Sequence, residues 1–228
     1  MTLGRKAAAE GLGTALLVAT IVGSGIAAAR LSPGDTGVQL LENSLATGAV
    51  LVALILTFQP VSAAFNPLVS LVEAGLGTLA WPEALVLGAA QVVGGIGGAV
   101  LANLMFGLDP VSWSSQDRSG GGLLLAEAVA TFGLVLVVFG GFRTGRIETL
   151  AFAVGGYIAA AYWFTSSTSF ANPAVTVARM LSDTFAGIAP VSVLPFLLAQ
   201  TAGAAAAAVT VRYLFPITTV TGNLEATS

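Results

Sequence analysis

Six long apolar runs set the limits on how this chain can fold. They cover roughly residues 10–30, 43–64, 83–106, 122–142, 149–166 and 190–215. A bilayer core takes about 20 apolar residues as a helix, so each run is long enough to cross it. Only 8% of the 228 residues are charged, whereas soluble domains carry about 25%. The sequence therefore predicts an all-α membrane protein with six transmembrane helices.

The basic residues predict how the chain is oriented. Six crossings bring both termini to one side, and Lys and Arg accumulate on the cytoplasmic side. Five basic residues would lie on the side of the termini: Arg5, Lys6, Arg143, Arg146 and Arg212. Three would lie on the opposite side: Arg30, Arg118 and Arg179. This bias predicts a multi-pass protein of the inner (plasma) membrane with both termini in the cytoplasm.

The residue types that are absent exclude several function classes. The chain has no cysteine and no histidine, which removes thiol nucleophiles, Ser-His catalysis and most zinc sites. The net charge is −3 and no basic stripe exists to meet phosphates. We therefore expect no enzyme activity, no metal, no cofactor and no nucleic-acid partner.

Two shorter apolar segments, residues 66–80 and 172–186, each begin with Asn-Pro. Asn caps helices, and Pro is favoured at the first helical position. Both segments are too short to cross a bilayer. Broken helices occur in membranes only where protein or a water-filled cavity satisfies their backbone groups. The sequence thus predicts two re-entrant half-helices that line a conduit.

Three markers occur twice in the same order along the chain. Each copy has Ala-Glu in its first span, then the Asn-Pro segment, then Ala-Gln in its third span. The markers are Glu10, Asn66-Pro67 and Gln91 in one copy and Glu127, Asn172-Pro173 and Gln200 in the other. We interpret residues 1–228 as a single channel domain with two repeats, 9–106 and 122–215. Three crossings per copy make the second an inverted repeat, which is typical of transporters and channels.

Inverted symmetry would bring the two half-helix N-termini together near the midplane. Each N-terminus carries roughly half a positive charge from its aligned peptide dipoles. Two of them pointing at one spot would repel cations. We expect the Asn66 and Asn172 amides to donate hydrogen bonds to water in the conduit, which would interrupt proton transfer along it.

With these motifs in place, the chain resembles the aquaporins, or major intrinsic proteins, over residues 9–215. The resemblance implies an aquaporin-like right-handed bundle that forms a homotetramer in the lipid bilayer with one pore per subunit. It implies that Glu10 and Glu127 hold the re-entrant loops, and that Gln91 and Gln200 pack the half-helices. The implied pore boxes are Asn66-Pro67-Leu68, with Leu where Ala is usual, and Asn172-Pro173-Ala174.

The resemblance also locates a selectivity filter in which the usual arginine is missing. Family members carry Arg three residues after the second-box Asn, where this chain has Val175. The nearest arginine, Arg179, is about 10 Å further along the helix, so we expect it in the outer vestibule or against the loop near Asp183. The other filter positions fall on Thr47 (or Ala46), on Ala160 or Ala161, and on Ser169 or Phe170.

A filter of this kind would be wide, with little charge and few donors. It predicts a passive channel for water, glycerol and neutral metalloid hydroxides such as arsenous acid. The run YWFTSSTSFANPAVTVAR (162–179) also resembles a bacterial subgroup associated with arsenic resistance. The alternatives are a water-selective aquaporin, and an ion-coupled secondary transporter with broken helices in which Glu10 or Glu127 titrates.

Overall fold

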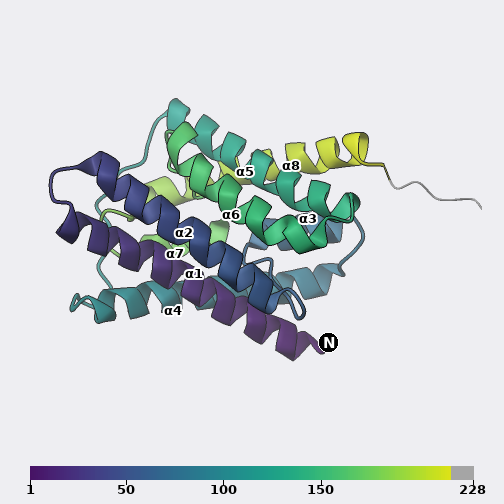
Figure 1. The fold of residues 1–228 in the computed structure, drawn as a ribbon, viewed down its shortest axis with the longest axis horizontal. Coiled ribbons are helices and arrows are strands. Elements are labelled where there is room, and N and C mark those ends of the chain that lie inside the picture. The colour runs from purple at the N-terminus through teal and green to yellow at the C-terminus, as the bar shows by residue number, and fades with distance from the viewer. Residues whose placement is uncertain (217–228) are drawn as a thin grey trace, which may run out of the picture.

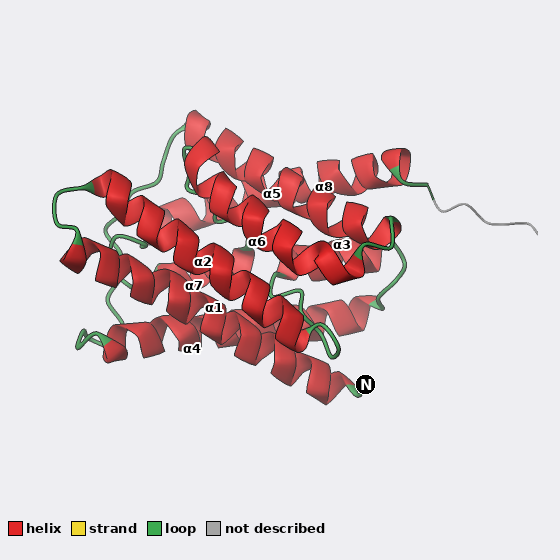
Figure 2. Cartoon of the chain, in the orientation of Figure 1, coloured by secondary structure: helices red, strands yellow, loops and turns green. Residues whose placement is uncertain are grey.

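The computed structural model describes residues 1–216, which form eight helices (Figure 1). They are α1 (Leu3–Leu31), α2 (Thr36–Phe58), α3 (Pro67–Gly75), α4 (Trp81–Met105), α5 (Gly121–Arg143), α6 (Ile147–Phe164), α7 (Pro173–Arg179) and α8 (Pro190–Leu214). Six of them are long and apolar enough to cross a membrane. The described part of the chain contains helices and loops but no strand (Figure 2). The expected all-α membrane architecture, with six spans and two short re-entrant helices, is confirmed.

The long helices pair in the same way in both halves of the chain. Helix α1 packs along α4, and α5 packs along α8, while α2 and α6 pack against each other between these pairs. The short helices α3 and α7 approach each other inside the bundle from opposite ends (Figure 1).

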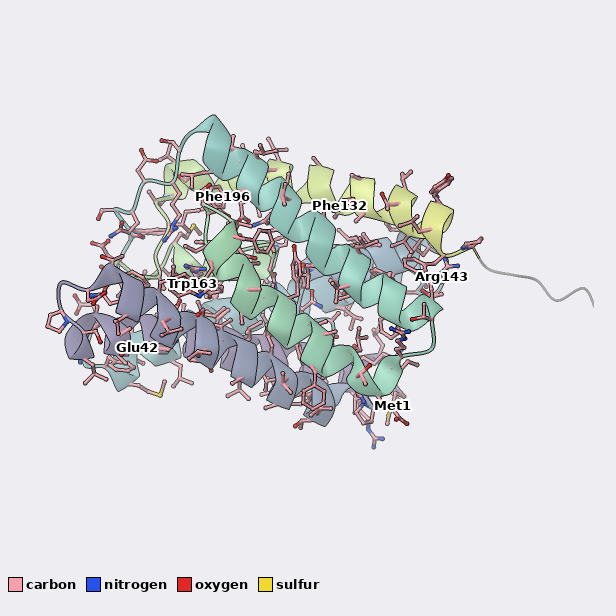
Figure 3. The ribbon with its side chains drawn as sticks, turned by 45° about the horizontal axis from the view of Figure 1, so that its top comes forward. Met1, Glu42, Phe132, Arg143, Trp163 and Phe196 are labelled. Carbon is pink, nitrogen blue, oxygen red and sulfur yellow. The ribbon has the colours of Figure 1, made fainter. Side chains whose placement is uncertain are left out.

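Both ends of the described chain lie at the same end of the bundle. Helix α1 begins and α8 ends there (Figure 1). Met1 and Arg143 lie at this end, whereas Glu42 and Trp163 lie toward the other (Figure 3). The Lys6 ammonium pairs with Glu83 at 2.6 Å. An even number of crossings accounts for this placement.

Helix α2 begins and ends earlier than residues 43–64, the range that its hydrophobicity suggests. Asp35 caps its N-terminus by accepting a hydrogen bond from the Val38 amide at 3.0 Å. Pro60 follows the last turn and lacks the amide that would continue the helix. Capping residues therefore moved both boundaries by about one to two turns, which the apolar run did not reveal.

The half-helices are also shorter than the apolar segments that contain them. Helix α3 ends at Gly75 rather than at residue 80, and Gly77 then adopts a φ of 84° that turns the chain away. Helix α7 ends at Arg179 rather than at residue 186. Beyond it, the Ala186 carbonyl accepts a hydrogen bond from Arg179 Nε, which holds a loop where more helix was expected.

Glycines let the paired helices touch backbone to backbone. A Cβ atom on Gly98 of α4 would lie 2.2 Å from the Ala15 carbonyl oxygen of α1. A Cβ on Gly203 of α8 would lie equally close, 2.2 Å, to the Ala128 carbonyl oxygen of α5. Small residues at such crossings are what allow transmembrane helices to pack closely.

The Gly98→Ala variant is expected to be less stable by about 1–3 kcal/mol, because α1 and α4 must separate to admit the methyl group. Thermal melting of the detergent-solubilised protein measures this. Gly97→Ala is the matched control, since a Cβ on that neighbouring glycine meets no atom within 4 Å. Equal melting temperatures for the two variants would contradict the tight crossing.

Candidate functional site

A cavity of about 530 Å³ extends through the bundle from Lys6 and Glu73 at one end to Arg179 at the other. We call it the conduit. The long helices line it with residues four apart, which lie on one helix face. On α2 these are Thr47, Leu51 and Ile55, continued by the C-cap residue Gln59, and on α6 they are Leu150, Val154, Ile158 and Tyr162. The wall between the two ends is therefore mostly apolar.

The two half-helices contribute matching positions to the conduit. The spacing i, i+3, i+7 follows one face of each helix. On α3 this face carries Asn66, Val69 and Glu73, and on α7 it carries Asn172, Val175 and Arg179. The first two positions carry the same residue types in both halves. The third differs, because the first half has the carboxylate Glu73 where the second half has the guanidinium Arg179.

Each Asn-Pro box starts its half-helix in the same way. Asn66 Oδ1 accepts from the Leu68 amide at 3.0 Å, and Asn172 Oδ1 accepts from the Ala174 amide at 2.9 Å. Leu68 is buried, and it does not line the conduit. The cap uses only the Leu68 backbone, so Leu and Ala support the same box geometry.

The two boxes are joined to each other by reciprocal hydrogen bonds. Asn66 Nδ2 donates to the Ala171 carbonyl at 2.8 Å, and Asn172 Nδ2 donates to the Phe65 carbonyl at 2.7 Å. The side-chain amide nitrogen of Asn carries two hydrogens. Each Asn therefore uses one across the junction and keeps one for the conduit, which both side chains line.

Glu127 holds the loop before the second box. Its side chain is completely buried and accepts from the Phe170 amide at 2.8 Å and the Ala171 amide at 2.9 Å. Gln200 Nε2 donates to the same carboxylate at 2.6 Å and to Thr176 Oγ1 of α7 at 2.8 Å. One buried carboxylate thus binds a loop, a span and, through Gln200, the half-helix.

Glu10 has the same arrangement in the first half of the chain. It is also completely buried and accepts from the Ala64 amide at 2.8 Å and the Phe65 amide at 2.6 Å. Gln91 Nε2 donates to Glu10 at 2.8 Å and to Ser70 Oγ of α3 at 3.1 Å. Glu10 and Glu127 therefore contact the loops in both halves, whereas Gln91 and Gln200 bind these carboxylates and the half-helices.

These contacts hold a backbone that would otherwise relax. Phe65 and Ala171 adopt φ values of 48° and 49°, and Thr168 and Ser169 adopt 62° and 51°. A left-handed conformation costs a residue with a side chain roughly 1–2 kcal/mol. It also aims the Phe65 and Ala171 carbonyls at the opposite box. No glycine marks these positions in the sequence, so this strain could not be predicted.

Polar groups line the conduit at the end where α7 finishes. Thr47 Oγ1 and the Tyr162 hydroxyl lie 3.1 Å apart. Ser169 Oγ is buried and has no hydrogen-bond partner among the described residues. Phe170 and Val175 complete the wall. Thr47, Ser169, Phe170 and Val175, four of the predicted filter positions, thus all line the conduit.

Neither alanine that was predicted for the α6 filter position lines the conduit. Ala160 is exposed on the outside of the bundle, and Ala161 is buried between helices without lining the conduit. Tyr162 occupies the place instead, because it continues the four-residue spacing of Leu150, Val154 and Ile158. On α2, Thr47 lines the conduit and Ala46 does not.

Arg179 corrects the expectation of a filter with few donors. It is only 2% exposed, and its guanidinium carbon lies 3.5 Å from the centroid of the Phe170 ring. Among residues 1–216, it alone lines both the conduit and a second cavity of about 240 Å³ whose wall also includes Arg118. Arg179 lies seven residues after Asn172, so it is further along α7, but its side chain is on the same helix face as Asn172 and Val175.

Comparison with known proteins gives three findings. The family model described as "MIP: Major intrinsic protein" matches residues 1–149. Aquaglyceroporin AqpS of Rhizobium meliloti (strain 1021) is 48% identical over 213 residues, which are 93% of this chain and 91% of that protein. The X-ray structure of the aquaglyceroporin from Plasmodium falciparum matches with a TM-score of 0.73 and 20% identity, over 95% of this chain and 97% of that one.

Proposed function

The chain belongs to the major intrinsic protein family and is a multi-pass membrane channel rather than an enzyme, and we propose that it conducts water, glycerol and arsenous acid passively. Val175 carries this proposal. It stands where members of the family normally place the filter arginine, and it lines the conduit. A small apolar side chain there leaves room for solutes larger than water.

Arg179 is compatible with this cargo because its guanidinium is held to one side. Its flat face stacks on the Phe170 ring at 3.5 Å, and its Nε donates to the Ala186 carbonyl. Both contacts fix the group about one helical turn outward of Val175, where it offers its remaining N–H donors to a passing solute.

The outer end of the conduit suits a molecule with hydroxyls and an apolar skeleton. Hydroxyls of Thr47 and Tyr162, together with Arg179, offer hydrogen bonds. Beside them lie the apolar surfaces of Phe170 and Val175. Glycerol can satisfy both kinds of surface at once, and so can arsenous acid, a neutral trihydroxide of similar size.

The narrower cargo assignment draws on two likenesses. The relative that is 48% identical is named an aquaglyceroporin. The 162–179 run resembles the subgroup associated with arsenic resistance. We assign the filter to Thr47, Tyr162, Ser169, Phe170, Val175 and Arg179, the boxes to residues 66–68 and 172–174, and loop support to Glu10, Glu127, Gln91 and Gln200.

We further propose that the channel is a homotetramer in the inner membrane with both termini cytoplasmic, built from repeats 9–106 and 122–215. The basic side chains near the chain ends support this orientation. Arg143 Nη1 donates to the Phe215 carbonyl at 3.4 Å, and Arg212 donates to the Gly75 carbonyl, so both lie at the end where α1 begins. Residues 217–228 lie outside the described structure.

Stopped-flow light scattering on proteoliposomes tests the cargo. We expect glycerol and arsenous acid permeabilities well above those of protein-free vesicles, with flux linear in the gradient and independent of ions. Water permeability without glycerol permeability would identify a water-selective pore. Saturable, ion-dependent uptake would identify a secondary transporter and overturn the proposal.

A further inference from the structure

The second cavity, at the outer end of the conduit, has a charge that nothing in the wall balances. Its lining includes no Asp or Glu of the described chain, and its polar residues are Arg118, Arg179, Thr36, Asn43, Gln116 and Thr168. Among residues 1–216, the single ion pair is Lys6–Glu83, which joins the starts of α1 and α4. We call this cavity the outer pocket.

Arg179 enters the outer pocket with part of its hydrogen-bonding capacity unused. The side chain is 98% buried, as its 2% exposure shows. Nε donates to the Ala186 carbonyl, but neither Nη atom donates to any residue of the described chain. A guanidinium out of bulk water needs acceptors for these donors. The face that stacks on Phe170 supplies none.

Arg118 lies in the loop between α4 and α5, and its side chain is held by the carbonyls of two other loops. Its Nε donates to the Gly187 carbonyl at 2.8 Å, and its Nη1 points to the Ser167 carbonyl at 3.5 Å. Its guanidinium carbon lies 5.0 Å from the centroid of the same Phe170 ring. Burial lowers the pKa of Arg118 from its ordinary value, yet guanidinium stays charged at neutral pH. Phe170 thus orders two cations at one pocket.

Three nearby carboxylates, those of Asp183, Asp117 and Glu127, accept hydrogen bonds from other groups. Asp183 accepts from the Ser115 amide at 2.8 Å and from its hydroxyl at 2.9 Å. Asp117 accepts from Ser192 Oγ at 3.0 Å. Glu127 accepts from the loop backbone, as described above. None of them forms an ion pair with either arginine in the described chain.

We propose that the outer pocket binds a small oxyanion, of the size of a carboxylate or phosphate, between Arg179 and Arg118. Guanidinium donors bind such groups in pairs, and low local dielectric strengthens the contact. The apolar conduit beyond it disfavours a charge. The bound anion therefore stays at the entrance and competes with neutral solutes there. This second step rests on the conduit's being the permeation path, as proposed above.

Binding can be measured without flux. The purified channel is melted in detergent with sodium acetate, sodium phosphate or sodium chloride at equal ionic strength. We expect an oxyanion-specific rise in melting temperature for the wild type. Loss of a charge-assisted contact in Arg179→Gln or Arg118→Gln should weaken the apparent affinity about tenfold or more.

Arg30→Gln is the matched control. Arg30 lies at the same end of the bundle, stacks on Phe106 at 5.3 Å and donates to its carbonyl at 2.9 Å. It lines neither cavity, so its loss should leave the oxyanion effect intact. Arg179→Lys keeps the charge but not the planar fork, and we expect intermediate binding. If Arg179→Gln does not fold, Arg118→Gln and Arg179→Lys decide the question.

Flux then tests the competition. External acetate should slow glycerol entry into wild-type and Arg30→Gln proteoliposomes but not into Arg118→Gln vesicles. No oxyanion-specific stabilisation in the wild type, or equal stabilisation in the Arg118→Gln protein, would overturn the site. Glycerol flux measured without acetate separates the two proposals. Its absence, with binding intact, would refute the cargo assignment and leave the oxyanion site standing.

Discussion

Val175→Arg is expected to lower glycerol permeability at least about tenfold, equivalent to about 1.4 kcal/mol at the barrier, while water permeability falls much less. The residue is only 3% exposed and faces the conduit. A guanidinium there would narrow the ring and stand four residues from Arg179, where like charges on a helix repel. Glycerol needs the space that would be lost, whereas water does not.

Proteoliposome swelling with matched osmotic gradients of glycerol and of an impermeant sugar measures both permeabilities. Val175→Leu is the companion variant, because it adds bulk without charge or donors. We expect it to reduce glycerol flux less than Val175→Arg does. Glycerol permeability unchanged in Val175→Arg would show that residue 175 does not limit cargo size.

Glu127→Ala is expected to abolish channel activity and to destabilise the fold by about 3–5 kcal/mol, as losing one partner of a buried polar cluster does. The substitution removes the acceptor of the Phe170 and Ala171 amides, and one of the two acceptors of Gln200 Nε2, in a fully buried place. The positive φ at Ala171 would then relax. The carbonyl that binds Asn66 would move with it.

Thermal melting and glycerol flux of the same preparation measure this effect. Glu148→Ala is the control, since Glu148 is exposed in the first turn of α6 and its side chain has no hydrogen-bond partner in the described chain. Glu127→Gln, which keeps an acceptor but not the charge, should lie between the two. A Glu127→Ala protein as stable and as permeable as Glu148→Ala would refute the supporting role.

The sequence predicted the fold because its strongest signals are also the physical causes of the fold. Apolar runs of membrane-spanning length specify spans wherever lipid is the solvent. Asn66 and Asn172 begin helices where the chain is otherwise apolar, and the structure places helix starts at both. Boundaries were harder, because Asp35 and Gly77 set them through local backbone geometry rather than through hydrophobicity.

Which residues line the conduit at the predicted filter depends on the helix face as well as on the distance along the helix. Counting residues along α7 predicted how far Arg179 lies from Asn172 but not that its side chain points into the conduit. The spacing of residues 172, 175 and 179 puts all three on one helix face. In α6, the spacing of Val154 and Ile158 already pointed to Tyr162, whereas the family resemblance pointed to alanines. The positive φ at Phe65 has no sequence signal, so the crossed Asn bonds could not be foreseen.

Those crossed bonds have a consequence for biogenesis. Each box offers a carbonyl and an amide that only the other box satisfies, and in lipid neither loop can leave such groups unsatisfied without cost. The first box emerges from the ribosome about a hundred residues before its counterpart. The first box therefore stays incompletely hydrogen-bonded until the second box, residues 172–174, has been synthesised and inserted. Closure of the pore is then a concluding event of maturation, common to both halves, rather than two separate local ones.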